Sequence, residues 1–186
     1  MSAKTVFTVP NLITGARILA TPFVVYFLTT DQYLLAFWLF FAAGLTDWLD
    51  GFLARFYNQS SFLGQLLDPL ADKILIMAVS IGLYCHHQMP LWLFLPILCR
   101  DVFLMIGSLL IGLKRWDISL KPVFISKLNT LLQIMVCLSL LGKNYFAAVP
   151  AWFSPFLTTL FCATLMTTVL SGWSYAWLFF QGLRKP

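Results

Sequence analysis

Residues 47–73 read DWLDGFLARFYNQSSFLGQLLDPLADK and contain two helical patterns that a four-residue polar loop separates. On the second helix Asp68 and Asp72 form one stripe four residues apart, with Gly64 and Ser61 earlier on the same side. Two helices with so short a connection are neighbours, so the carboxylates are predicted to face each other across one cleft. On the first helix, five positions share one face that spans about 140° of the helix circumference: Asp47, Asp50, Gly51, Ala54 and Arg55.

The composition predicts a membrane protein. Of the 186 residues, 60% are hydrophobic and 10% charged, whereas a soluble domain carries about 25% charged residues. With roughly 20 residues per span, this length accommodates six spans. The predicted fold is therefore an all-α, polytopic membrane protein whose six transmembrane helices make a single catalytic domain over residues 1–186. The expected spans are 11–30, 33–57, 62–84, 91–113, 123–142 and 150–181.

Loop charges predict the orientation, because cytoplasmic loops are rich in Lys and Arg. Seven loop cations lie on the side of the termini, and Lys143 alone lies on the opposite side. Both termini and the Asp cluster are therefore predicted to be cytoplasmic. The predicted location is the cell inner (plasma) membrane. Although the formal charge is +5, scattered helix-end cations suit anionic headgroups, and no nucleic-acid partner is expected. The N-terminus lacks a cleavage pattern and is interpreted as mature sequence. The terminal-side cations are Lys4, Arg55, Lys114, Arg115, Lys121, Arg184 and Lys185.

The clustered carboxylates indicate a metal site. Each ionised Asp at membrane depth costs about 2.5–3.5 kcal/mol, so several together require a cation. Oxygen ligands without nearby His or Cys favour Mg²⁺ or Mn²⁺, and the small residues leave room for phosphates. In the alternative interpretation, the Asp residues pair with Arg55, Lys73 and Arg100 and only fix helix packing.

The signature resembles that of the CDP-alcohol phosphatidyltransferases, integral membrane enzymes with six spans. The matching pattern is Asp47-x-x-Asp50-Gly51-x-x-Ala54-Arg55, eight residues, Gly64-x-x-x-Asp68-x-x-x-Asp72. Four further stretches, at 43–55, 63–76, 99–107 and 120–130, are most similar to the branch formed by CMP-forming cardiolipin synthases of the eukaryotic type. The resemblance covers residues 6 to about 134.

This resemblance implies an activity and residue roles. The phosphatidyl group of CDP-diacylglycerol would pass to phosphatidylglycerol with release of CMP, Asp72 being the base. Two Mg²⁺ or Mn²⁺ ions per active site would bind Asp47, Asp50, Asp68 and Asp72. The opening TVPNLITGARI (8–18) implies that Asn11, Thr14 and Arg17 line the donor and acceptor pocket. The CDP-lipid contacts would be Gly51, Ala54, Arg55, Ser61, Gly64, Asn11 and Thr14.

Cations inside the spans need partners, and a lipid phosphate is one candidate. Arg17, Arg100 and Lys127 are therefore predicted to bind the acceptor phosphate, with a lateral gap to lipid beside 121–129. For Arg100 the competing interpretation is pairing with Asp101 or a helix C-terminus. Pro69 is expected to bend or break its helix, because it lacks an N–H.

Two other functions are compatible with these residues. The oligomeric state is implied only by the family resemblance. A phosphatidylglycerophosphate synthase would use the same donor with glycerol 3-phosphate. A cation-coupled transporter would also place carboxylates in the membrane, although no internal repeat is visible. The resemblance further implies a homodimer.

Overall fold

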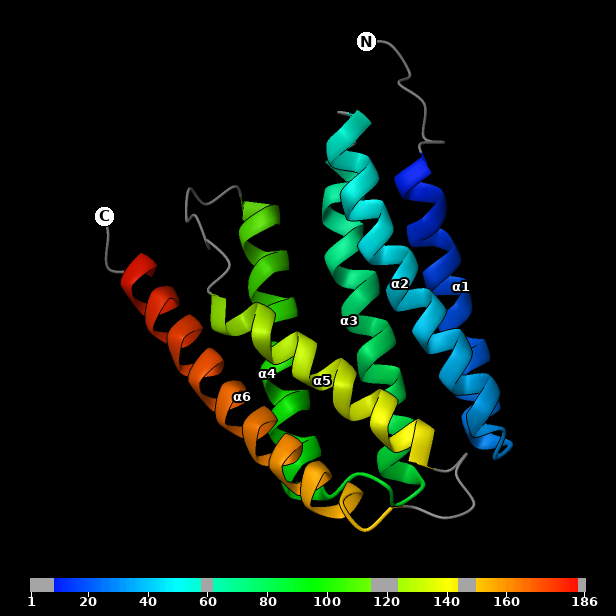
Figure 1. Ribbon diagram of the computed structural model, residues 1–186. Helices are drawn as coiled ribbons and strands as arrows, with labels where there is room; N and C mark the ends of the chain where they lie inside the picture. Colours follow the sequence, from blue (N-terminus) through cyan, green and yellow to red (C-terminus); the bar gives the residue numbers. More distant parts are fainter. Residues whose placement is uncertain (1–8, 58–61, 115–123, 144–149, 184–186) are drawn as a thin grey trace.

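The chain forms an all-helical bundle in the computed structural model. Backbone is described for residues 9–57, 62–114, 124–143 and 150–183, and side chains for 15–46, 72–107, 124–143 and 150–176. These ranges contain helices and no strand, which confirms the predicted all-α class (Figure 1). The largest difference from the predicted ranges is at the last helix, expected from 150 and observed from Phe153. The helices are α1 (Val9–Thr29), α2 (Tyr33–Tyr57), α3 (Phe62–Cys85), α4 (Leu91–Lys114), α5 (Phe124–Lys143) and α6 (Phe153–Leu183).

Two tight turns reverse the chain at the same side of the bundle. Asp31 lies in the turn after α1 with φ 57°, and His87 lies in the turn after α3 with φ 56°. This left-handed conformation is one that Asp and His adopt more readily than most residues. The Tyr33 hydroxyl donates to Asp31 Oδ1 at 2.8 Å. Successive helices are therefore antiparallel, α1, α3 and α5 running downward in Figure 1 and α2, α4 and α6 upward.

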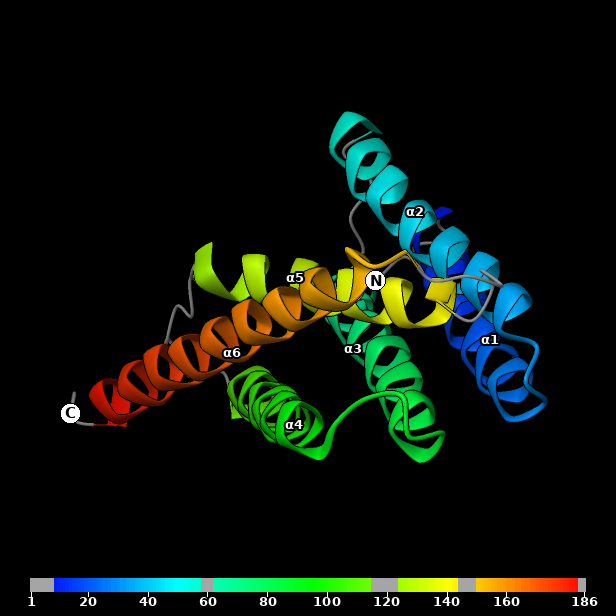
Figure 2. The ribbon, with the colours of Figure 1, turned by 60° about the horizontal axis from the view of Figure 1, so that its bottom comes forward.

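The helices pack as two groups that α3 and α5 connect. α1 packs against both α2 and α3, and α6 packs against α4 and α5. α5 also contacts α2 and α3, crossing them obliquely (Figures 1 and 2). Among the described residues, α1 and α5 thus bridge α2 and α3, the two helices that carry the signature.

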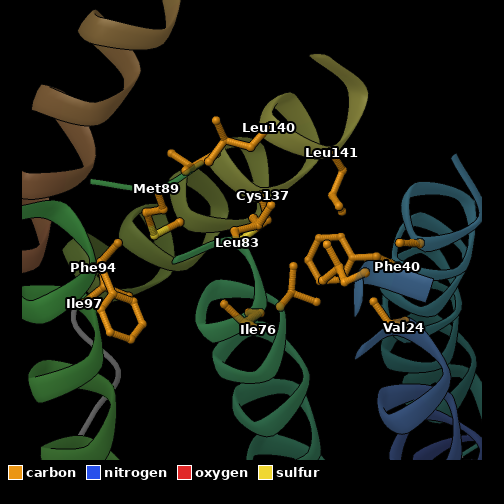
Figure 3. Close-up of a cluster of buried hydrophobic side chains, with 14 of the residues drawn as sticks. Val24, Phe40, Ile76, Leu83, Met89, Phe94, Ile97, Cys137, Leu140 and Leu141 are labelled. Carbon is orange, nitrogen blue, oxygen red and sulfur yellow. The ribbon is translucent and has the colours of Figure 1, made fainter. Parts of the chain in front are cut away.

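Among the described side chains, an apolar core lies between the helices. Val24, Leu83 and Leu141 are fully buried, and Phe40 and Phe94 nearly so. Figure 3 shows their neighbourhood, where side chains from α1 to α5 reach into the space between the helices. The outer faces are also apolar, with exposed Phe23, Trp38, Ile81, Trp92, Leu131 and Trp173 distributed over all six helices.

Length and hydropathy qualify two of the described helices as membrane spans. These are Phe124–Lys143 and Phe153–Ala176, and shorter apolar stretches cover Gly15–Thr29 and Tyr33–Thr46. This finding concerns the described side chains only, which in α3 and α4 are limited to 72–85 and 91–107. The six-span topology therefore stays a prediction.

Pro69 does not interrupt α3. The helix is continuous from Phe62 to Cys85, so the break that we considered there is wrong. A bend at Pro69 stays a prediction.

Truncation of a core residue tests this packing. Leu83→Ala is expected to lower the free energy of unfolding by about 2–5 kcal/mol, because it leaves a cavity at a fully buried position. Ile81→Ala on the same helix is the control, since Ile81 is 43% exposed; its loss should stay near 0.5 kcal/mol. Denaturant unfolding in detergent measures the free energy of unfolding of both variants. Equal losses would contradict the assignment of Leu83 to the core.

Candidate active site

The helices carry the predicted site residues on three neighbouring elements. α2 includes Asp47, Asp50, Gly51, Ala54 and Arg55, α3 includes Gly64, Asp68 and Asp72, and α1 includes Asn11, Thr14 and Arg17. Ser61 lies outside the described residues. Of this set only the side chains of Arg17 and Asp72 are described, so the roles of the others stay predictions.

Arg17 and Asp72 form an ion pair that joins α1 to α3. The Arg17 Nη1 donates to Asp72 Oδ1. The Arg17 side chain is 3% exposed and that of Asp72 is 32% exposed. The pair fixes the orientation of the Asp72 carboxylate at the edge of the bundle. The sequence assigned Arg17 to the acceptor phosphate and missed this pair, although a cation within an apolar span always requires a partner.

An apolar cavity lies between α2 and α3, and we call it the α2–α3 cavity. Its volume is about 380 Å³, and Arg17, Asp72 and Thr130 are its polar lining residues. α5 forms a further wall from Thr130 to Leu138. Three lining residues, Phe41, Leu45 and Leu131, are exposed on the outer surface. The cavity therefore opens between α2 and α5, and its lining is apolar except for the ion pair and Thr130.

The cavity differs in part from the predicted lateral gap. A space between α2 and α3 was expected, and the structure has one. Its wall on α5 begins at Thr130, however, directly after the segment 121–129 predicted to border the opening. Asn129 is fully buried and accepts hydrogen bonds from Thr167 and Thr168 of α6 at 2.9 and 2.8 Å. It therefore belongs to the contact between α5 and α6.

A second charged group lies beside the cavity, and we call Lys73, Arg100 and Asp101 the Asp101 cluster. Asp101 Oδ1 accepts from Lys73 Nζ at 2.9 Å and from Arg100 Nη1 at 2.6 Å. The Asp101 side chain is fully buried. Thr130 Oγ1 lies 3.3 Å from Lys73 Nζ and also lines the cavity. The cluster and the cavity therefore share a wall.

The described cations show which partner Asp72 has, whereas the two interpretations of the other signature carboxylates stay open. Lys73 and Arg100 were the candidates for pairing with the signature carboxylates, but both bind Asp101. Asp72 pairs instead with Arg17. The pairing of Asp72 with Lys73 or Arg100 that the packing interpretation expected is therefore wrong.

Arg100 and Lys127 differ in their surroundings. Arg100 donates to Asp101 and also to Ser126 at 2.6 Å and Ser171 at 2.8 Å. The pairing with Asp101 that competed with phosphate binding is thus present, and Arg100 ties α4 to α5 and α6. Lys127 is exposed on α5, and its binding of a lipid phosphate stays a prediction.

Asp72 is the one carboxylate among the described residues that line the cavity, and it could contribute to a metal site. Asp72 offers carboxylate oxygen at the polar end of the cavity, and that lining contains no His or Cys. Oxygen donors of this kind suit Mg²⁺ or Mn²⁺. The described side chains alone do not bring three potential ligands together, so Asp47, Asp50 and Asp68 would have to complete the site.

Neutralising Asp101 tests the Asp101 cluster. Asp101→Asn is expected to lower the free energy of unfolding by about 3–5 kcal/mol, because two cations lose their buried counter-charge. Asp31→Asn is the control, since the Asp31 side chain is 73% exposed. Unfolding in detergent measures both, and a loss for Asp101→Asn no larger than the control would contradict the ion pairs.

Comparison with known proteins places the chain in a family. A model of the CDP-alcohol phosphatidyltransferase family matches residues 7–179. The chain is 36% identical to "Cardiolipin synthase (CMP-forming)" of Rattus norvegicus, over 91% of this chain and 60% of that protein. It is 35% identical to the Homo sapiens protein of the same name with the same coverage. These findings confirm the predicted family.

A relative from Aquifex aeolicus has a name that denotes a different activity. The chain is 32% identical to "CDP-diacylglycerol--glycerol-3-phosphate 3-phosphatidyltransferase" of Aquifex aeolicus, over 89% of this chain and 91% of that protein. The chain spans only about 60% of the length of the two mammalian relatives. The relatives therefore have names that denote two different activities.

Proposed function

The chain belongs to the CDP-alcohol phosphatidyltransferase family, and from this membership we propose that it is a cardiolipin synthase. It transfers the phosphatidyl group of CDP-diacylglycerol to phosphatidylglycerol and releases CMP. The names of the two mammalian relatives support this acceptor.

The observation that carries the proposal is the polarity of the α2–α3 cavity. A CDP-linked lipid has a charged pyrophosphate and apolar acyl chains. Arg17, Asp72 and Thr130 provide one polar region, and Phe40, Ile134 and the other lining residues provide an apolar wall. The lateral opening between α2 and α5 lets an acyl chain enter from the bilayer without crossing water.

Asp47, Asp50, Asp68 and Asp72 are proposed to hold two divalent cations, Mg²⁺ or Mn²⁺. Members of the family generally depend on a divalent metal. When bound, the cations supply charge neutralisation for the pyrophosphate. The proposed contacts to the CDP lipid are Asn11, Thr14, Gly51, Ala54, Arg55, Ser61 and Gly64.

Asp72 is proposed as the general base. Arg17 holds Asp72 Oδ1 and so fixes the carboxylate plane before the acceptor arrives. The acceptor hydroxyl gives its proton to Asp72, and its oxygen forms a bond to the β-phosphorus of the donor. The bond from that phosphorus to the bridging oxygen breaks, and its electron pair leaves with CMP.

The acceptor phosphodiester is proposed to lie near α5, where Lys127 is exposed. Arg100 can contribute only by giving up a hydrogen bond to Ser126 or Ser171. Arg17, which lines the cavity, can contribute positive charge.

The membrane arrangement is proposed from the sequence and the family. The six helices span the cell inner (plasma) membrane, with both termini and the active site on the cytoplasmic side. Apolar side chains exposed on all six helices support contact with lipid. The family resemblance further suggests a homodimer.

Metal removal tests the role of the carboxylates. EDTA is expected to abolish CMP release, and Mg²⁺ or Mn²⁺ should restore it, because four carboxylates near a pyrophosphate repel without a cation. Release of CMP from CDP-diacylglycerol is the measurement. Full activity in chelator would contradict the two-metal site.

Asp72→Asn tests the base. Turnover should fall about 100-fold or more, because the amide cannot accept the proton, whereas binding of CDP-diacylglycerol should stay within a few fold. Single-turnover CMP release and a lipid-binding titration measure the two effects, with Asp31→Asn as control. If the variant keeps more than a tenth of the wild-type rate, the base lies elsewhere.

Lys127→Ala tests the acceptor contact. The KM for phosphatidylglycerol should rise roughly tenfold, while that for CDP-diacylglycerol should change little. Lys143→Ala is the matched control, because Lys143 is exposed at the other end of α5. Equal rises in both KM values would remove Lys127 from the acceptor site.

The competing function is phosphatidylglycerophosphate synthesis with glycerol 3-phosphate, which the Aquifex aeolicus relative favours through its name and coverage. The purified protein with CDP-diacylglycerol and Mg²⁺ should be given each acceptor separately, with the lipid product identified by mass. Cardiolipin formed from phosphatidylglycerol supports the proposal. Turnover with glycerol 3-phosphate alone would establish the competing activity.

A further inference from the structure

Asp72 and Lys73 are consecutive on α3 and bind partners on different helices. Asp72 pairs with Arg17 of α1. Lys73 Nζ donates to Asp101 Oδ1 of α4 at 2.9 Å and to Thr130 Oγ1 of α5 at 3.3 Å. The turn of α3 that carries Asp72 is therefore linked to three other helices.

These links restrict the rotation of α3. Consecutive side chains on an α-helix point about 100° apart, so the two residues bind in different directions from the helix axis. A rotation that keeps Asp72 on Arg17 but moves Lys73 would break the contacts with Asp101 and Thr130. Side-chain exposures of 18% for Lys73 and 0% for Asp101 show that little water is available to replace them.

Charge balance does not by itself require Lys73. Arg100 Nη1 also binds Asp101, at 2.6 Å, so a single cation already neutralises this carboxylate. Lys73 adds a second, partly buried positive charge whose desolvation is unfavourable. Its contacts fix the geometry of α3 beside the cavity.

We propose that Lys73 is a positioning residue, which through Asp101 and Thr130 holds α3 in the rotation that presents Asp72 to the α2–α3 cavity. This inference rests on the proposed function, since it gives Asp72 its orientation for the divalent cation and for the acceptor hydroxyl. Lys73 itself need not touch either substrate.

Lys73→Met tests the proposal, because it keeps an unbranched side chain and leaves the Arg100–Asp101 pair intact. The Kd for Mn²⁺, measured without turnover by electron paramagnetic resonance of free Mn²⁺, should rise about tenfold. The kcat at saturating metal should fall about tenfold. Lys73→Arg restores a cation that can donate to Asp101 and should bring both values within about threefold of wild type.

Two further variants separate positioning from general loss of structure. Lys143→Met removes an exposed cation from α5 and should leave both values unchanged. Thr130→Val removes one of the two partners of Lys73 and should shift the Mn²⁺ Kd in the same direction by a smaller factor. It also provides the test if Lys73→Met does not fold.

The outcomes distinguish this proposal from the proposed function. A wild-type protein that neither binds Mn²⁺ nor releases CMP would overturn the function itself. A second outcome is that the wild type is active while the folded Lys73→Met variant has a Mn²⁺ Kd and a kcat within twofold of the wild-type values. That result would overturn only the role of Lys73. Reduced thermal stability with unchanged Kd would assign Lys73 a purely structural role and also overturn the proposal.

Discussion

Ion pairing within an apolar bundle is the constraint on which the site depends. A charged side chain in such surroundings is stable only with a counter-charge or a ligand. Asp72 meets this requirement through Arg17, and Lys73 through Asp101. Because these partners belong to different helices, the pairs fix how α1, α3 and α4 meet. The position of the candidate base is therefore determined by electrostatics rather than by apolar packing alone.

The proposed substrate cavity borders the packed core of the molecule. Apolar side chains from α1 to α5 are buried between the helices, as Leu28, Leu83 and Leu141 show. Phe40, Leu75 and Ile76 belong to this core and also line the α2–α3 cavity, which opens between α2 and α5. An amphipathic donor can thus enter sideways while the core keeps the helices in register. The proposed chemistry needs this combination, since both lipid substrates remain partly in the bilayer.

The sequence predicted the helices well because apolar runs and polar turns alternate clearly. It also placed a space between the two signature helices, from the loop length and the spacing of Asp47 to Asp72. It missed the pairing of Arg17 with Asp72 and the place of Asn129 between α5 and α6. Such contacts depend on how helices distant in sequence pack, which periodicity does not encode. For Arg100 the sequence indicated two partners, a lipid phosphate and Asp101. It could not decide between them, because phosphate and carboxylate both accept hydrogen bonds from a guanidinium.

The central claim is that Asp72, held by Arg17, contributes to a divalent cation site in the α2–α3 cavity. Anomalous scattering from Mn²⁺ in crystals of the protein locates that site directly. The account predicts a peak at about 2.1 Å from an Asp72 oxygen, with Asp47, Asp50 and Asp68 as further ligands. A Mn²⁺ peak outside the cavity, with Asp72 bound to Arg17 alone, would contradict it.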